Sequence, residues 1–161
     1  MIRNVTPADA PQLLDIYGYY ILNTTFTTEE KLPTVEEMAK RVERITQHFP
    51  WIGLEHDGVL LGYCYADTFR TRTAWHRTAE VSVYVHPEHN GEGIASQLYP
   101  LLFRRLRETT DIHSLVACIT LPNENSARLH ESFGFIKKAN LNEVGYKFGN
   151  WMDVGIWHRI L

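Results

Sequence analysis

The stretch from Thr78 to Leu102 constrains the fold of this chain most. Residues 78–85 alternate polar and apolar side chains and are rich in β-branched and aromatic types, which predicts a strand. His86-Pro87 ends it, because proline lacks a backbone donor and restricts the residue before it. A glycine-rich turn, residues 90–96, then leads into a helical pattern of apolar side chains at Ile94, Leu98, Leu101, Leu102 and Leu106. Such a strand, turn and helix N-terminus present free N–H groups, which predicts a site for a phosphate-bearing ligand.

The glycine turn also has a plainer interpretation, as an ordinary loop. Gly91–Ser96 lacks the third glycine of a dinucleotide fingerprint, does not follow the first strand of the chain, and lacks the lysine of a phosphate-binding loop. As an isolated pattern it is weak. Its position between a central strand and a long helix favours the phosphate interpretation.

The rest of the chain adds further strands and helices. Helices are expected from Pro7, after a Thr6 cap, and over residues 35–47. A third precedes Gly134. The dipeptide Asp57-Gly58 predicts a tight hairpin. The other expected strands are residues 2–5, 51–55, 59–66, 115–119, 135–143 and 152–161. Without repeats or linkers, the pattern predicts one α/β domain over residues 1–161, with a mixed sheet of about seven strands and about four helices.

The bulk properties narrow the class of function. A net charge of −3 gives no global basic field of the kind that collects nucleic acid. No apolar run approaches the length of a membrane span, and the start lacks an apolar signal region, so a cytoplasmic protein is expected. Cys64 and Cys118 lie in apolar, strand-like runs and are expected to be buried thiols rather than a disulfide.

Glu80 is the first candidate for chemistry. On an alternating strand it shares one face with Ser82 and Tyr84. That face is either a solvated outer surface or the wall of a cleft, where burial would raise the pKa of the carboxyl towards the range of a general base. The pattern leaves both interpretations open.

Asn123, Ser126 and His130 share one helical stripe. They form either a polar face that binds an amide-bearing ligand and delivers a proton, or a capped surface helix. His86, Glu88 and His89 lie close together, but without the helical spacing of paired ligands. No metal site is expected.

Two motifs carry a family resemblance. Residues 83–95, with Asn90, Gly93 and Ala95 at the key positions, resemble the acyl-CoA-binding motif of the GNAT superfamily of N-acetyltransferases. The spacing of Asn123, Ser126 and His130 before Gly134-Phe135 resembles the second signature of that superfamily. More narrowly, residues 70–85, 129–131 and 144–153 are similar to the phosphinothricin and methionine sulfoximine acetyltransferase branch.

The resemblance implies a mostly antiparallel GNAT sheet, acetyl-CoA as co-substrate, no metal, and a homodimer. In that dimer a loop of residues 145–151, which carries aromatic side chains, would cover the partner's pocket. Glu80 and His130 would be the catalytic residues. Glu80 would be the general base, and His130 would lie near the thiol, where either it or solvent would protonate the departing thiolate. Acetyl-CoA contacts would come from Val83, Tyr84, Val85, Gly91, Glu92, Gly93, Ile94, Ala95, Ser96, Asn123 and Ser126. Three residues depart from the usual pattern or geometry: Asn90, Trp75, and Pro100 inside the long helix.

The leading hypothesis is therefore an N-acetyltransferase for a small, amino-acid-like amine. Arg72 is expected to pair with a carboxylate or phosphinate, and Arg70 to be more peripheral. Phe26 and Trp75 would pack against the aliphatic part of the substrate. A non-catalytic acyl-CoA sensor and a protein N-terminal acetyltransferase are the alternatives. Glu80 and the Arg70–Trp75 loop argue for an enzyme with a closed pocket.

Overall fold

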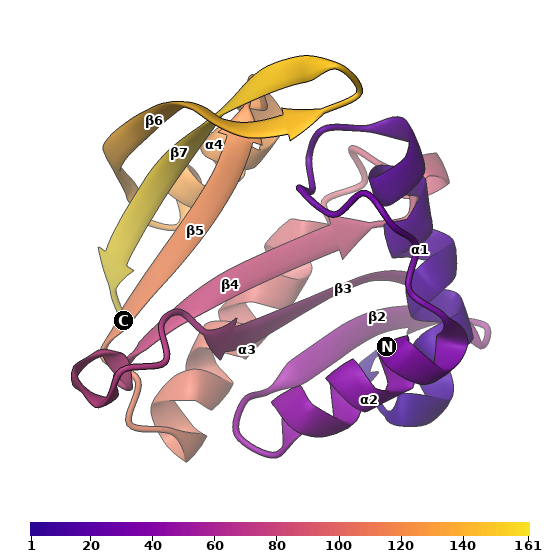
Figure 1. Ribbon diagram of the computed structural model, residues 1–161. Helices are drawn as coiled ribbons and strands as arrows, with labels where there is room; N and C mark the ends of the chain where they lie inside the picture. The colour runs from indigo at the N-terminus through magenta and orange to yellow at the C-terminus, as the bar shows by residue number, and fades with distance from the viewer.

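A twisted, seven-stranded sheet runs through the computed structural model, which describes residues 1–161 (Figure 1). The strands lie in the order β1-β2-β3-β4-β5-β7-β6, and every neighbouring pair is antiparallel except β4 and β5. They are β1 (Ile2–Asn4), β2 (Trp51–His56), β3 (Val59–Thr68), β4 (Thr78–Val85), β5 (Ser114–Leu121), β6 (Ile136–Lys147) and β7 (Asn150–Ile160). The prediction of a mixed, mostly antiparallel sheet is confirmed.

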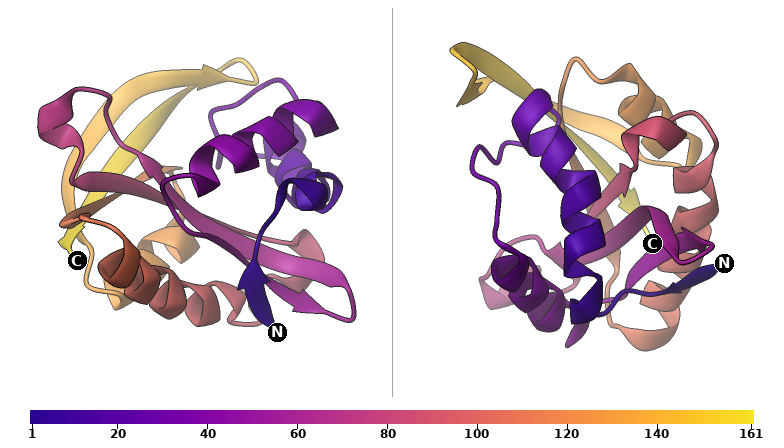
Figure 2. Two further views of the ribbon diagram at one scale, coloured as in Figure 1. Left: turned by 90° about the horizontal axis from the view of Figure 1, so that it is seen from below. Right: turned by 90° about the vertical axis from the view of Figure 1, so that its right-hand side faces the viewer.

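Four α-helices cover the two faces of the sheet. They are α1 (Ala10–Asn23), α2 (Val35–Thr46), α3 (Ile94–Thr109) and α4 (Glu124–Ser132). Helices α1 and α2 lie on one face and α3 on the other (Figure 2). The start of α2 follows from a capping box, because the Thr34 hydroxyl accepts from the Glu37 N–H at 3.1 Å while the Glu37 carboxylate accepts from the Thr34 N–H. Helix α3 stays continuous through Pro100. No helix is long and apolar enough to cross a bilayer.

Two hydrophobic cores fix which face each side chain of β4 occupies. Ala79 and Val81 are buried in the core under α3. Their neighbours Glu80, Ser82 and Tyr84 therefore point to the face that carries α1 and α2. The core on that face contains Trp51 and Tyr63 from the sheet. The alternation of the sequence thus places Glu80 on the side where the helices leave part of the sheet uncovered.

The closing hairpin differs from the prediction. Residues 145–151 were expected to form a loop, but β6 and β7 run through this segment and meet at a two-residue turn. Phe148 and Gly149 make that turn with φ of 52° and 76°. Positive φ at both positions matches the twist of the flanking strands, as it also does at Asp57-Gly58. The loop prediction is wrong because the turn takes only Phe148 and Gly149, and the residues on either side of it pair as strands.

The two parallel strands β4 and β5 separate partway along their length. Their pairing contains only Thr78↔Ser114, Ala79↔Leu115 and Glu80↔Val116, although β4 continues to Val85 and β5 to Leu121. Beyond Glu80 one edge of β4 therefore has no neighbouring strand. The divergence opens a wedge in the middle of the sheet (Figure 1).

Candidate active site

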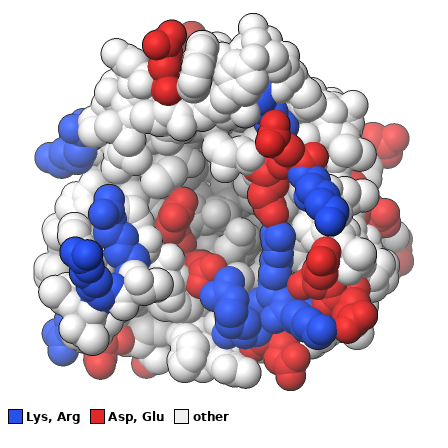
Figure 3. Space-filling model, in the orientation of Figure 1, with Lys and Arg blue, Asp and Glu red and all other residues white.

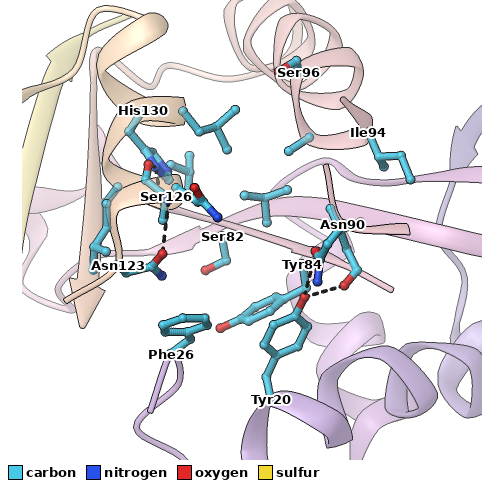
Figure 4. A pocket seen from close by; sticks show the side chains of 18 of the residues that line it. Tyr20, Phe26, Ser82, Tyr84, Asn90, Ile94, Ser96, Asn123, Ser126 and His130 are labelled. Atoms are coloured by element: carbon cyan, nitrogen blue, oxygen red, sulfur yellow. Dashed lines mark hydrogen bonds between the residues drawn. The ribbon is translucent and has the colours of Figure 1, made fainter. Parts of the chain in front are cut away.

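A cavity of about 520 Å³ occupies the wedge between β4 and β5. Its walls come from the free end of β4, the glycine turn, the starts of α3 and α4, and the middle of β5 (Figure 4). Of the predicted site residues, those that line it are Phe26, Val83, Tyr84, Val85, Gly91, Gly93, Ile94, Ala95, Ser96, Asn123, Ser126 and His130. The structure thus brings together side chains that are up to about a hundred residues apart in the sequence.

The glycine turn forms one end of this cavity. Gly91 and Gly93 have φ of 86° and 75°, a region that L side chains rarely adopt, and Gly93 is the N-cap of α3. The first helical bond of α3 runs from the Gln97 N–H to the Gly93 carbonyl at 3.2 Å, so the N–H groups before it have no partner within the helix. This end of the cavity suits an anionic ligand.

Asn123 and Ser126 form the opposite wall at the start of α4. The Asn123 side-chain oxygen accepts from the Ser126 N–H at 3.2 Å, which caps the helix. Its amide nitrogen makes no hydrogen bond within the chain, and the residue lines the cavity (Figure 4). Asn123 therefore acts as a helix cap and keeps a donor for a ligand.

His130 is held in a single tautomer. Its Nδ1 lies 2.7 Å from the Ser126 carbonyl oxygen, which can only accept, so Nδ1 carries the proton. Its Nε2 lies 2.8 Å from the Tyr99 hydroxyl, which must then donate. Burial lowers the pKa of the imidazole, only partly opposed by the Ser126 carbonyl. Burial thus favours the neutral ring, in which both nitrogens are hydrogen-bonded.

Glu80 lies at the point where β4 and β5 separate, half-buried and just outside the cavity wall. Burial raises the pKa of its carboxyl; the neighbouring Cys118 thiol lowers it and Asp67 raises it further. The carboxyl is thus displaced towards the range in which a carboxylate accepts protons effectively.

The exposure of Cys118 differs from the sequence prediction that both thiols are buried. Cys64 is fully buried, as expected, but Cys118 is exposed to the cavity. The run 115–119 was interpreted as a strand covered on both faces, and the divergence of β4 uncovers it at Cys118. Although the side chain reaches the cavity, partial burial, followed by the Glu80 carboxylate, raises the pKa of this thiol to about 12. Both cysteines are free, as predicted.

Phe26 closes the cavity from the loop between α1 and α2. That loop is held by hydrogen bonds from both sides: the Tyr17 and Thr27 hydroxyls lie 2.8 Å apart, and the buried Lys147 on β6 donates to the Thr27 carbonyl at 3.0 Å. Phe26 itself remains partly exposed. The ring therefore lies on an anchored loop rather than on a free one.

The other predicted residues lie outside the cavity wall. Glu92 pairs with His89 at 3.1 Å on the surface. Arg70 and Trp75 stack on each other in the loop between β3 and β4, with the guanidinium carbon 5.2 Å from the ring centroid, and Arg72 is exposed on the same loop. The charge of Arg70 still lowers the pKa of Cys118, which places Arg70 near the cavity.

Several wall residues were not anticipated from the sequence. Tyr20 from α1 lines the cavity, and its hydroxyl donates to the Val85 carbonyl at 2.6 Å. Ala117, Cys118 and Ile119 line the cavity from β5, together with Leu129 from α4. No local signal marks them, because they become wall residues only through the divergence of two strands.

The surface around the cavity is divided by charge. The face in Figure 3 is hollowed near its centre, with acidic side chains at the edge of the hollow and Lys and Arg side chains to either side. A ligand that carries both charges would meet complementary groups here.

Comparisons with known proteins agree with this geometry. Residues 2–156 match the family described as acetyltransferase (GNAT) domain. The chain is 38% identical over 158 residues to the phosphinothricin N-acetyltransferase of Streptomyces viridochromogenes, covering 98% of this chain and 86% of that protein. It is 34% identical over 154 residues to the L-methionine sulfoximine/L-methionine sulfone acetyltransferase of Salmonella typhimurium, covering 95% and 90%.

A solved structure gives the same result. The phosphinothricin acetyltransferase of Sinorhizobium meliloti, crystallised in complex with acetyl-CoA, superposes with a TM-score of 0.94 at 33% identity, covering 100% of this chain and 88% of that one. The chain therefore belongs to the GNAT family of acetyltransferase enzymes, in the branch of the phosphinothricin and methionine sulfoximine acetyltransferases.

Proposed function

We propose that this enzyme moves the acetyl group of acetyl-CoA to the amine of a small amino acid of the phosphinothricin or methionine sulfoximine type, with Glu80 as general base. The observation that carries the proposal is the divergence of β4 and β5 directly after Glu80. It places a carboxyl of raised pKa at the mouth of a cavity whose far end suits a phosphate.

Acetyl-CoA would lie along the free edge of β4. Its pyrophosphate would accept from the free backbone N–H groups in the turn of residues 91–96. The Glu92 N–H already donates to the His89 carbonyl at 3.4 Å, so Glu92 would shape the turn rather than donate. Val83 and Val85 would offer backbone groups to the pantetheine arm, with Tyr84 between them, and the Asn123 amide would donate to it from the other wall. The similar protein from Sinorhizobium meliloti was crystallised with acetyl-CoA, which supports acetyl-CoA as the ligand.

The chemical step would begin with loss of a proton from the substrate ammonium to Glu80, directly or through water. The neutral amine then attacks the thioester carbonyl, and an unpaired N–H of β4 stabilises the oxyanion as it forms. As the tetrahedral intermediate collapses, the nitrogen loses its second proton to water, the amide forms and the carbon–sulfur bond breaks. Glu80 then releases the proton it accepted to solvent.

Protonation of the departing thiolate has two candidate sources, His130 and solvent. The single ring proton of His130 is held at Nδ1 by the Ser126 carbonyl, and buried Tyr99 occupies Nε2. If the neutral ring donated its Nδ1 proton, an imidazolate would remain unless the Tyr99 hydroxyl passed its proton to Nε2. Burial raises the pKa of that hydroxyl, which disfavours such a transfer. We therefore propose that solvent supplies the proton and that His130 orients the start of α4.

The substrate is assigned from the cations near the cavity. Arg70 and Arg72 would pair with the carboxylate and the second polar group of the amino acid, while Phe26 and Trp75 would pack on its aliphatic part. The names of the similar enzymes support this class. Two free thiols are in keeping with a reducing, cytoplasmic location.

A thiol-release assay with acetyl-CoA and an amine panel tests the proposal. The panel comprises phosphinothricin, methionine sulfoximine, ordinary amino acids, a polyamine, an arylamine and a peptide with a free N-terminus. Turnover of the amino-acid analogues is expected. Turnover of the peptide alone would favour a protein N-terminal acetyltransferase, and acetyl-CoA binding without any turnover would favour a sensor.

Two variant pairs separate the binding roles. Gly93→Val should weaken acetyl-CoA binding strongly, whereas Gly93→Asn should weaken it less, because asparagine tolerates the left-handed conformation. Arg72→Ala should raise the Michaelis constant for the amino acid far more than that for acetyl-CoA, whereas Arg70→Ala, which removes a more peripheral charge, should raise it less. An unchanged dissociation constant in Gly93→Val would refute the proposed cofactor position.

A further inference from the structure

Asp67 lies directly opposite Glu80 across the antiparallel pair of β3 and β4. Directly paired residues on such strands have side chains on the same face, with Cβ atoms about 5 Å apart. Two carboxylates therefore lie beside each other just outside the cavity wall, where β4 and β5 separate. Nothing in the proposed acetyl transfer uses Asp67.

An arginine from another element holds Asp67. The Arg44 guanidinium on α2 donates to both carboxylate oxygens, at 3.1 and 2.9 Å, and the Thr68 N–H donates to one of them at 2.7 Å. The Asp67 side chain is 26% exposed and that of Arg44 60% exposed. Such a two-point contact fixes the position of the Asp67 charge better than a single hydrogen bond would.

We propose that Asp67 and Arg44 are positioning residues for the reaction, an ion pair that sets the net charge beside the general base Glu80. The inference rests on the proposed role of Glu80. Asp67 disfavours a second negative charge at Glu80, and Arg44 offsets part of that effect. The pair thereby adjusts the pH at which Glu80 becomes a free carboxylate.

Other groups also act on Glu80 or on its immediate neighbours. Burial and Asp67 raise the pKa of Glu80, and Cys118 on β5 lowers it. The charges of both carboxylates in turn raise the pKa of Tyr65 on β3. Arg70, on the loop between β3 and β4, acts on Cys118. Asp67 differs from these groups because it is a carboxylate directly opposite Glu80 and is paired with the Arg44 guanidinium.

The ion pair permits a test in which two variants break the same contact with opposite results. Asp67→Asn removes the negative charge, so the acid limb of the pH–kcat profile should move to lower pH. Arg44→Gln leaves Asp67 charged without its counter-ion, so the limb should move to higher pH. Each shift should be about half a pH unit or more, because the charges are close but partly screened.

Matched variants control for changes unrelated to Glu80. Lys40→Gln removes one positive charge from the same helix by breaking the exposed Lys40–Glu36 pair, and it should leave the limb in place. Arg44→Lys keeps the charge and should restore the profile of the unmodified enzyme. Thermal melting of each variant, at the pH values of the assay, confirms that it is folded.

The outcome separates this inference from the proposed function. Loss of the acid limb in Glu80→Gln assigns the limb to Glu80. If that limb persists in Glu80→Gln, the general-base proposal fails, and this inference with it. If the limb belongs to Glu80 but Asp67→Asn and Arg44→Gln leave it unmoved, or move it in the same direction, the ion pair is only structural and the inference alone is overturned.

Discussion

The Cys118 thiol is exposed to the cavity, yet its acidity is very weak. Its pKa of about 12 leaves a thiolate fraction on the order of one in ten thousand at pH 8, and the thiolate is the reactive form. We expect slow reaction with a disulfide reagent such as DTNB. In Glu80→Gln the reaction should be several-fold faster, because the neighbouring negative charge is removed.

Cys64 is the internal control for this prediction, because it is fully buried and should react only after unfolding. Equal rates for Cys118 in the two proteins would show that Glu80 and Cys118 do not interact. Acetyl-CoA should also protect Cys118 if it binds where proposed.

The Tyr99–His130 contact should contribute measurably to stability. Tyr99→Phe removes the hydroxyl that donates to Nε2 and leaves a buried ring nitrogen without a partner. The free energy of unfolding should fall by about 1–3 kcal/mol, measured by urea denaturation. Tyr19→Phe is a suitable control, because Tyr19 is exposed and its hydroxyl makes no hydrogen bond within the chain. A fall no larger than that of the control would contradict the assigned tautomer.

At the scale of elements, an ion pair joins β1 to the start of α1. Arg3 donates to both oxygens of Asp9, at 2.9 and 2.8 Å, and the Thr6 N–H donates at 2.7 Å. The Arg3 hydrogen bonds, followed by that of Thr6, lower the pKa of Asp9 below its usual value of 3.8, against the effect of burial. At pH values near 3.8 the folded protein therefore binds fewer protons at Asp9 than the unfolded chain does. The stabilisation from the Arg3–Asp9 pair is present above that pH and is lost as the pH falls below about 3.8.

Asp9→Asn should therefore destabilise the protein by about 1–2 kcal/mol at pH 7, and the difference from the unmodified protein should shrink as the pH falls below about 4. Urea denaturation at several pH values measures both quantities. Asp15→Asn, an exposed carboxylate without an ion pair, serves as control. A destabilisation of Asp9→Asn that does not change with pH would contradict the ion-pair explanation.

At the scale of the whole molecule, the hairpin of β6 and β7 carries an apolar patch. Tyr146, Phe148 and Trp151 at its end are 57%, 57% and 63% exposed, and Lys147 anchors this end of the hairpin to the Thr27 loop. Exposed aromatic residues on a fixed element are typical of an interface. We expect a homodimer through this patch.

Light scattering at micromolar concentration measures the mass. Trp151→Lys should shift it towards the monomer, whereas Ile136→Lys, an exposed apolar residue at the other end of β6, should not. A protein that is monomeric before any substitution contradicts this prediction. If the partner's hairpin also covers the pocket, Trp151→Lys should lower turnover as well.

Much of the fold could be predicted because its signals are local. The capping box at Thr34, the turn at Asp57-Gly58 and the glycines before α3 each involve residues within a few positions of one another. Backbone conformation and hydrogen bonding at that range are decided by side chains that the sequence places side by side. The phosphate-suited end of the site followed from the same kind of signal.

The rest of the site was decided by tertiary packing. The divergence of β4 and β5 exposed Cys118, although the pattern of its strand predicted burial. Arg44 reaches Asp67 across 23 positions, and Lys147 reaches Thr27 across 120. Such contacts depend on where two cores place α2 and the hairpin over the sheet. Local patterns contain no information about that placement, so the sequence could name Glu80 as a candidate base but not the ion pair beside it.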